Sequence, residues 1–291
     1  MREFVQCLLD SVSKDLSDID PDEVLSVADY MADALRHGKE IKLSGDGFTE
    51  DCVLEAKQIS DLAGEKKGNF DLVSSFSEKD DPDSYDALIC NRKSQCPDKP
   101  SILLHSDDLE GFRSTVASVC KVIFRLAKLN LVGKKAAFID RDDTIAKDVP
   151  YCSDPKDFNL FDGVPESIRK LNDAGYLVIL ITNQSGIGRG KFTEETLNRI
   201  HDKMLREVEK GGGRIDDIFF CPHHPDDKCQ CRKPNILMGI RAVEKYDIDP
   251  RKSFMIGDSD ADMEFGRRLG CKTVRVSKDH TFSDAVNGIL I

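Results

Sequence analysis

This chain has few positively charged residues relative to its acidic ones. Among its 291 residues, 42 Lys and Arg stand against 53 Asp and Glu, which leaves a net charge of −11. Nucleic acids and acidic membrane surfaces select for clustered Lys and Arg, so neither is expected as a partner. An anionic substrate would have to be held by local cations and by metal rather than by the overall field of the protein.

The chain also lacks a long apolar run. No segment approaches the ~18 residues that span a bilayer, and Asp10 interrupts the N-terminal stretch where a signal peptide would need an unbroken apolar core. We therefore expect a cytoplasmic protein without a membrane partner, whose ten cysteines are thiols or metal ligands rather than disulfides. Seven of them are scattered along the chain, whereas three crowd together at Cys221, Cys229 and Cys231.

Two halves of different character are visible in the hydrophobic pattern, and both alternate strands with helices as α/β proteins do. A stronger pattern begins after Gly133-Lys134-Lys135, so we place a boundary near residue 132, with domains at 1–132 and 133–291. In the first half we expect helices at 21–36 and 109–129, another beginning at Thr49, and strands at 41–43, 72–73, 87–90 and 102–105. In the second half we expect strands at 136–139, 177–181, 218–220, 253–256 and 272–276, with helices at 164–174, 194–210, 236–246 and 261–269.

Polar residues follow several of these strands directly, where an open α/β sheet places its chemistry. Asp140 and Asp142 come after the first strand of the second half. One carboxylate can attack phosphorus, while the other protonates the leaving oxygen and later deprotonates water. The alternative for this pair alone is a solvated acidic turn.

Three further segments fit the same chemistry. Thr182 is followed by Asn183, Gln184, Ser185 and a glycine, a turn whose hydroxyl and backbone N–H groups can hold phosphoryl oxygens. Lys233 can neutralise charge on a phosphoryl group. Asp258 and Asp262 follow another strand, and carboxylates that face a polyanion need a cation between them, for which all-oxygen ligation favours Mg²⁺. A calcium loop is the rival, but the spacing of an EF-hand is absent.

In this order, Asp140-x-Asp142-x-Thr144, Thr182, Lys233 and Gly257-Asp258-x-x-x-Asp262 resemble the four motifs of the haloacid dehalogenase (HAD) superfamily of phosphohydrolases. The resemblance covers about residues 134–280 and implies a Rossmann-like fold with a parallel sheet and, from the short motif spacing, no large cap. It implies Asp140 as nucleophile, Asp142 as general acid and base, and Thr182 and Lys233 as phosphoryl-binding residues. It also implies Mg²⁺ on Asp140, Asp258 and the backbone carbonyl of Asp142, with Asp262 orienting the last motif. Asp143 departs from the glycine usual in the family, which affects the turn rather than the chemistry.

A second metal is expected at Cys221, His223, Cys229 and Cys231. Three thiols and an imidazole at this density favour a closed, structural zinc site, with His224 as the competing imidazole. Because the cluster ends just before Arg232 and Lys233, we expect it to fix the loop that carries the catalytic lysine.

The substrate is less defined by the sequence. The segments DRDDT, TNQSGIGRGKF, CPHHP and CQCRKP resemble the branch of heptose bisphosphate and histidinol-phosphate phosphatases. The TNQSGIGRGKFTEE run is closer to the heptose enzymes, whereas the short cysteine spacing is closer to the histidinol enzymes, and Ser259 differs from the lysine of the heptose branch. Beyond Asn183, Gln184 and Ser185, the candidate substrate contacts are Arg189, Arg232 and the 145–160 segment.

The first half weakly resembles a sugar isomerase (SIS) domain of the phosphoheptose isomerase kind, through Ser44-Gly45-Asp46-Gly47 after a strand and through the segment that begins at Ser101. It is too short for the complete domain, so we interpret it as a reduced SIS-like domain for dimerisation or ligand sensing. The resemblance favours hydrolysis of D-glycero-D-manno-heptose 1,7-bisphosphate at its 7-phosphate. The alternatives are a histidinol-phosphate phosphatase, a bifunctional isomerase–phosphatase, and a non-catalytic sugar-phosphate-binding protein.

Overall fold

A computed structural model describes residues 1–12, 19–36, 41–44, 70–73, 87–90, 101–103 and 109–291. By its internal contacts the chain divides into a unit at Arg2–Gly133 and a unit at Lys134–Ile291 that also includes Met1. Among the described residues, no helix combines the length and apolar character needed to cross a bilayer. The helix expected at Thr49 and the Gly45-Asp46-Gly47 turn lie outside the described residues.

In the N-terminal unit, described helices accompany a small parallel sheet with strand order β2-β1-β3-β4. Side chains such as Phe4, Val24, Met31 and Ile123 are fully buried where the helices pack together. The first helix, α1, was not expected from the sequence. The elements are α1 (Arg2–Val12), α2 (Pro21–Arg36), β1 (Ile41–Ser44), β2 (Phe70–Val73), β3 (Ala87–Cys90), β4 (Ser101–Leu103) and α4 (Leu109–Val132).

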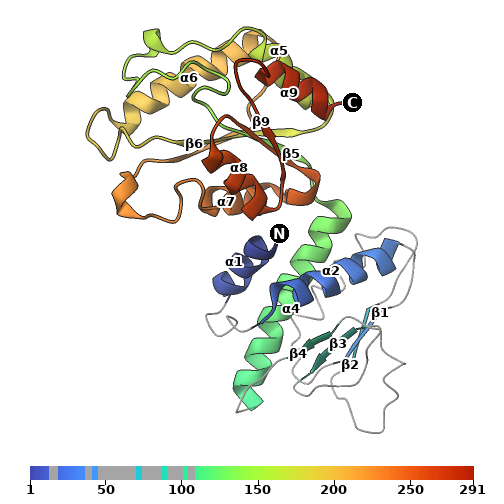
Figure 1. Ribbon diagram of the computed structural model, residues 1–291. Helices are drawn as coiled ribbons and strands as arrows, with labels where there is room; N and C mark the ends of the chain where they lie inside the picture. The colour runs from blue at the N-terminus through green and yellow to red at the C-terminus, as the bar shows by residue number, and fades with distance from the viewer. Residues whose placement is uncertain (13–18, 37–40, 45–69, 74–86, 91–100, 104–108) are drawn as a thin grey trace. The chain divides into compact units, whose positions relative to one another are not determined.

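The C-terminal unit is built on a five-stranded, wholly parallel sheet with the order β7-β6-β5-β8-β9. Helices cover both faces of the sheet, with α5, α6 and α9 on one side and α7 and α8 on the other (Figure 1). This confirms the predicted α/β architecture with a parallel sheet. The strands are β5 (Ala136–Ile139), β6 (Leu177–Asn183), β7 (Asp217–Cys221), β8 (Phe254–Gly257) and β9 (Lys272–Arg275); the helices are α5 (Val164–Asp173), α6 (Glu194–Lys210), α7 (Leu237–Tyr246), α8 (Asp260–Leu269) and α9 (Phe282–Ile289).

Strand β5 lies at the centre of this sheet and is buried along its whole length. A parallel sheet covered on both faces requires such a continuous apolar strand, because side chains on each side meet a helix layer. Ala137 and Ile139 belong to the core that includes Ile168 of α5 and Ile200 of α6. Phe138 makes an edge-to-face contact with Phe265 of α8, with ring centroids 6.4 Å apart. The central strand therefore delivers the residue that follows it, Asp140, from a rigid support.

Candidate active site

The predicted catalytic residues meet at the carboxyl edge of the sheet. Asp140 follows β5, Thr182 is near the end of β6, and Asp258 follows β8. These three strands are adjacent and parallel, so their carboxyl ends lie side by side. Asp140 is 8% exposed and Thr182 is 1% exposed, whereas Asp258 is half-buried.

Lys233 is the buried cation of this site. Its Nζ lies 2.5 Å from Asp140 Oδ1 and 2.6 Å from Asp262 Oδ1, and it also donates to the carbonyl oxygen of Ile181 at 2.7 Å. Its side chain is only 3% exposed, so these acceptors replace the water that the ammonium group loses on folding. Burial opposes the charged form, but the carboxylates of Asp140 and Asp262 outweigh it and raise the pKa of Lys233. The lysine is therefore charged and directed at the expected nucleophile.

The carboxylates of the site are placed to hold a cation. Oxygens of Asp140, Asp258 and Asp262 all lie within 4.8 Å of one another. Burial raises the pKa of Asp140 to about 7, with Lys233 opposing the shift, and burial followed by the charge of Asp262 raises the pKa of Asp258. A divalent cation would offset the repulsion among these carboxylates, and the all-oxygen donor set fits Mg²⁺.

Asp262 is held by Ser259 through one oxygen and forms an ion pair with Lys233 through the other. Its Oδ2 accepts hydrogen bonds from Ser259 N at 3.1 Å and Ser259 Oγ at 2.6 Å, in a capping box that begins α8. Its buried Oδ1 lies 2.6 Å from Lys233 Nζ as an ion pair, without a hydrogen bond of good geometry among the described residues. This arrangement suits a residue that orients the last motif, and it leaves Asp140 and Asp258 as the better candidates for metal ligands.

Asp142 is held by neighbours rather than left as a free acidic side chain. Arg141 donates to both of its oxygens, from Nε at 2.9 Å and from Nη2 at 3.0 Å. Gln184 Nε2 donates to Asp142 Oδ2 at 2.9 Å and also to Thr182 Oγ1 at 2.8 Å. Sequence reasoning assigned no role to Arg141; the signal that could have revealed one is a cation between two expected catalytic carboxylates.

The predicted substrate contacts separate into three kinds. Asn183 brackets the backbone of Lys233, accepting from its N at 3.0 Å and donating to its O at 3.3 Å, and Gln184 contacts Asp142 as described. Ser185 is half-buried and Arg189 is exposed. Arg232 is partly buried, and its Nη1 atom has no hydrogen-bond partner within the part of the chain that the structure describes. Of the two arginines, Arg232 is thus the one with a buried donor to offer an anion.

The departure at Asp143 has a local explanation. Its φ of 52° is in the left-handed region that glycine adopts without strain and that Asp and Asn tolerate better than most residues. Its Oδ1 accepts a hydrogen bond from Asp148 N at 3.0 Å, which ties down the turn. Asp143 therefore preserves the geometry that glycine provides at this position.

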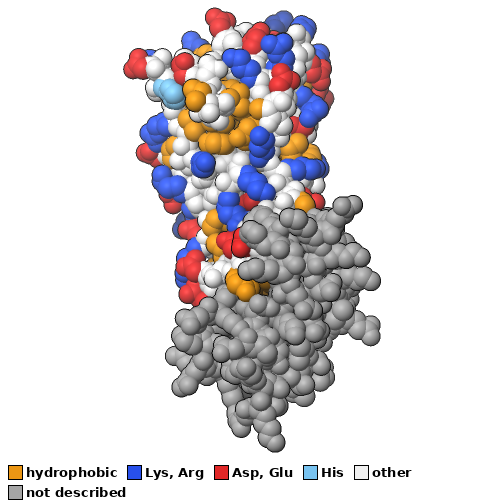
Figure 2. All heavy atoms as spheres, turned by 90° about the vertical axis from the view of Figure 1, so that its right-hand side faces the viewer, with side chains coloured by type: hydrophobic (Ala, Val, Ile, Leu, Met, Phe, Trp, Pro, Cys, Tyr) orange, Lys and Arg blue, Asp and Glu red, His pale blue; other side chains and the backbone are white. Residues whose placement is uncertain are grey.

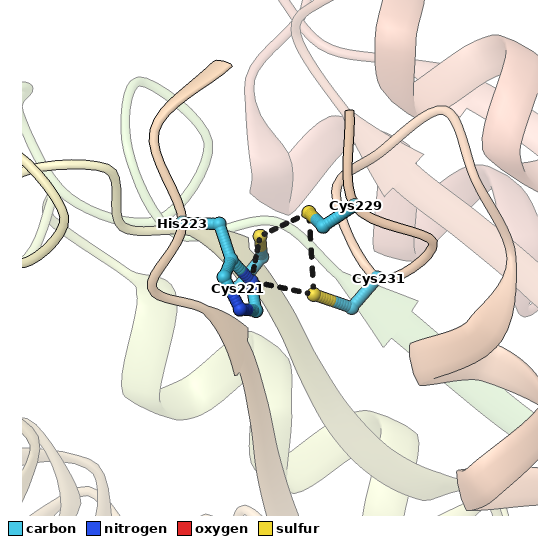
Figure 3. A group of neighbouring side chains, drawn as sticks. All are labelled: Cys221, His223, Cys229 and Cys231. Carbon is cyan, nitrogen blue, oxygen red and sulfur yellow. Dashed lines mark hydrogen bonds between the residues drawn. The ribbon is translucent and has the colours of Figure 1, made fainter. Parts of the chain in front are cut away.

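The cysteine cluster converges on one point, as Figure 3 shows. Cys221 Sγ lies 3.5 Å from Cys229 Sγ and 3.6 Å from His223 Nδ1, and Cys231 Sγ lies 3.5 Å from Cys229 Sγ and 3.2 Å from His223 Nδ1. A tetrahedron of thiolates with Zn–S bonds of about 2.3 Å has edges of about 3.8 Å, close to these separations. His224 instead accepts from Asp226 N at 3.2 Å and caps a short helical turn. The donor set fits zinc.

The cluster is joined to the catalytic loops through the backbone. Asn235, which is two residues beyond Lys233, donates from Nδ2 to the carbonyl oxygen of Cys229 at 2.9 Å. On the other side, Gln184 N donates to Cys221 O at 2.7 Å and Gly188 N to Pro222 O at 2.8 Å. The Cys3His cluster therefore lies between the loop that carries Lys233 and the loop that follows Thr182.

Beside the catalytic edge lies a pocket of about 760 Å³. Asp258, Thr144 and Asp143 contribute to its wall, together with Phe161, Phe282 and Val276 and the side chains of Lys147 and Lys278. Figure 2 displays one face of the molecule, on which hydrophobic side chains of the C-terminal unit gather among Lys, Arg, Asp and Glu. The pocket therefore shares Asp258 and Thr144 with the catalytic edge and continues past Val276 to Phe282.

Comparisons with known proteins match the C-terminal unit. A family model described as HAD-hydrolase-like matches residues 230–288. A probable D-glycero-D-manno-heptose-1,7-bisphosphate 7-phosphatase of Thermoplasma volcanium is 41% identical over 136 residues, which are 46% of this chain and 93% of that protein. The D-glycero-beta-D-manno-heptose-1,7-bisphosphate 7-phosphatase of Haemophilus ducreyi is 39% identical over 149 residues, 49% of this chain and 82% of that protein.

Among solved structures, the D,D-heptose 1,7-bisphosphate phosphatase of B. bronchiseptica, crystallised with magnesium and phosphate, matches with a TM-score of 0.50 and 32% identity over 54% of this chain and 98% of that one. The fold and the strand-end carboxylates define the class of a HAD phosphatase, a phosphoric monoester hydrolase. Over its C-terminal half, the chain belongs to the HAD-like phosphatase family, in the group of the heptose bisphosphate phosphatases.

Proposed function

We propose that this chain hydrolyses D-glycero-D-manno-heptose 1,7-bisphosphate at its 7-phosphate, through a phosphoryl group carried on Asp140. The observation that carries the proposal is the convergence of Asp140, Lys233 and Asp258 at one sheet edge. The unit that holds these residues is 41% and 39% identical to two heptose bisphosphate phosphatases.

In the first half-reaction, an Asp140 oxygen attacks phosphorus while the bond from phosphorus to the sugar oxygen breaks. Asp142 gives a proton to that departing oxygen. Thr182 and Lys233 hold the phosphoryl oxygens, and the ammonium group of Lys233 is already directed at Asp140 at 2.5 Å. In the second half-reaction, water attacks the phosphoryl group, Asp142 takes its proton, and Asp140 is released with inorganic phosphate.

Asp140, Asp258 and the backbone carbonyl of Asp142 would hold Mg²⁺, with Asp262 orienting this motif. When bound, the ion supplies charge neutralisation between the carboxylates and the substrate phosphate. Cys221, His223, Cys229 and Cys231 would hold a structural Zn²⁺, a role supported by the near-tetrahedral spacing of their donor atoms.

For substrate recognition we propose Arg232 as the principal side-chain contact outside the phosphoryl site, because its Nη1 is buried without a partner among the described residues. Asn183 and Gln184 then act mainly on Lys233 and Asp142, while Ser185 and Arg189 remain candidate contacts at the rim. The reduced SIS-like domain at 1–132 and its part in forming a homo-oligomer stay predictions, as does a cytoplasmic location.

Histidinol phosphate is the second candidate substrate, favoured by the short spacing between Cys221 and Cys229. The test is phosphate release from a panel of both heptose 1,7-bisphosphate anomers and histidinol phosphate, with Mg²⁺, for the wild type and for Asp140→Asn. We expect a strong preference for a heptose bisphosphate that is lost in the variant. A preference for histidinol phosphate would overturn the substrate assignment, and unchanged turnover by the variant would overturn the assignment of Asp140 as nucleophile.

A further inference from the structure

Arg141 is a buried cation without a role in the reaction described above. It stands between Asp140 and Asp142 in the chain and is only 3% exposed. A guanidinium group taken out of water is costly unless its donors are paired. Here Nε donates to Asp142 Oδ1 at 2.9 Å and Nη2 to Asp142 Oδ2 at 3.0 Å, so that the planar group clamps one carboxylate with two parallel bonds.

The opposite side of the guanidinium group meets His201, a buried residue of α6. Arg141 Nη1 lies 3.4 Å from His201 Nε2. Because arginine can only donate, His201 Nε2 must accept, and the ring is then neutral with its proton on Nδ1. Burial, followed by the charge of Arg141, lowers the pKa of His201 to about 3, which agrees with a ring that stays neutral. The ring of Phe158 lies 5.8 Å from Arg141 Cζ and fills another side.

Among the described residues, the side-chain groups that are hydrogen-bonded to the Asp142 oxygens are all donors. Gln184 Nε2 adds a bond to Oδ2 at 2.9 Å beside those from Arg141. Both carboxylate oxygens thus act as hydrogen-bond acceptors, and the direction of these bonds fixes the plane of the carboxylate. This geometry matches the second half-reaction, in which an oxygen of the fixed Asp142 carboxylate accepts the proton of water.

We propose that Arg141, fixed by the neutral ring of His201, is a positioning residue that aligns Asp142 to deprotonate the water that hydrolyses the phosphoryl-Asp140 intermediate. This inference rests on the proposed phosphatase function. In the step concerned, the water oxygen bonds to phosphorus, its proton passes to an Asp142 oxygen, and the bond between phosphorus and the Asp140 oxygen breaks to release phosphate.

The two half-reactions can be separated with p-nitrophenyl phosphate and Mg²⁺ in a stopped-flow experiment. Nitrophenolate leaves without a proton, so formation of the phosphoryl enzyme, which kcat/KM reports, does not need Asp142 as an acid. For Arg141→Gln we expect kcat to fall about 10- to 100-fold, part of the 10²- to 10⁴-fold that general-base catalysis typically contributes. We expect kcat/KM to change less than about 3-fold and a burst of nitrophenolate, stoichiometric with active sites, to appear as in the reference variant Asp142→Asn.

A pair of variants at His201 provides the matched control. His201→Gln keeps an acceptor for Arg141 and should behave as the wild type, whereas His201→Leu removes the acceptor and should show a burst. Circular dichroism establishes that each variant is folded. Equal losses of kcat and kcat/KM in Arg141→Gln without a burst, or identical kinetics of the two His201 variants, would overturn the inference while the phosphatase function stands. No turnover by the wild type would overturn the proposed function itself.

Discussion

Replacement of Lys233 by methionine tests whether this lysine is the counter-ion that holds the catalytic carboxylates together. The lysine side chain is 3% exposed, and its Nζ lies 2.5 Å from Asp140 and 2.6 Å from Asp262. Removing one partner from a buried ionic group costs about 3–5 kcal/mol, because the remaining charges stay buried without compensation. In a unit of about 150 residues each kcal/mol lowers Tm by about 2–4 °C, so we expect Tm to fall by about 6–20 °C in buffer without added Mg²⁺.

Differential scanning calorimetry is the suitable assay, since the chain has no tryptophan whose fluorescence would report unfolding. Excess Mg²⁺ should raise Tm more for Lys233→Met than for the wild type, because a cation held by Asp140 and Asp258 would supply part of the positive charge that the variant has lost. The matched control is Lys245→Met, which removes a lysine 2.8 Å from Asp217 whose side chain is 58% exposed. A fall in Tm for Lys233→Met no larger than for this control would refute the reasoning.

Three further predictions follow from other contacts. Cys229→Ser should release zinc and lower kcat about 10- to 100-fold through the loop of Lys233, while Cys152→Ser leaves the zinc content unchanged; normal kcat without zinc would contradict this. Folding lowers the pKa of His201 from 6.5 to about 3, so between these values the unfolded chain binds a proton that the folded chain does not. The free energy of unfolding should therefore decrease as the pH falls below 6.5, by about 2 kcal/mol at pH 5. Urea unfolding at pH 7.5 and pH 5 should show a smaller decrease in unfolding free energy for His201→Gln than for the wild type. An equal decrease in the two proteins would refute this prediction. Asp143→Val should be about 1–2 kcal/mol less stable in urea than Asp143→Asn, because a β-branched residue is strained at positive φ; equal stabilities would show that the turn tolerates either.

Much of the C-terminal fold could be predicted because local signals agree there. The helix predicted at 194–210 is α6, Glu194–Lys210, whose start is marked by Thr193 as N-cap. Strand β6 extends two residues beyond the prediction, since Thr182 and Asn183 pair with Phe220 and Cys221 of β7. That pairing is a tertiary effect which the hydrophobic pattern of one segment does not contain.

Two helices were missed for different reasons. Helix α1 (Arg2–Val12) was considered only as a possible signal peptide, although its buried Phe4 and Leu8 follow helical spacing. Helix α9 (Phe282–Ile289) is short, but Thr281 and Asp284 form a capping box that a search for N-terminal signals would have found. Both were therefore accessible from sequence.

The supporting contacts of the site could not be predicted in the same way. The motif residues Asp140, Thr182 and Lys233 are recognisable by type and order, but the partners that orient them come from distant segments. Asn183 and Lys233 are 50 residues apart, and Arg141 and His201 are 60 apart. No periodicity links such pairs, because the first contact arises only when the loop before α7 reaches the end of β6, and the second only when α6 packs beside β5.

The central claim is that Asp140 carries the phosphoryl group during turnover. Wild-type protein mixed with heptose 1,7-bisphosphate and Mg²⁺ should be quenched in acid within a single turnover and digested for mass spectrometry. The account predicts an acid-stable, hydroxylamine-sensitive phosphoryl group on the peptide that contains Asp140, and neither this adduct nor phosphate release from Asp140→Asn. Phosphate release from the wild type with no adduct on that peptide, or undiminished release from Asp140→Asn, would contradict it.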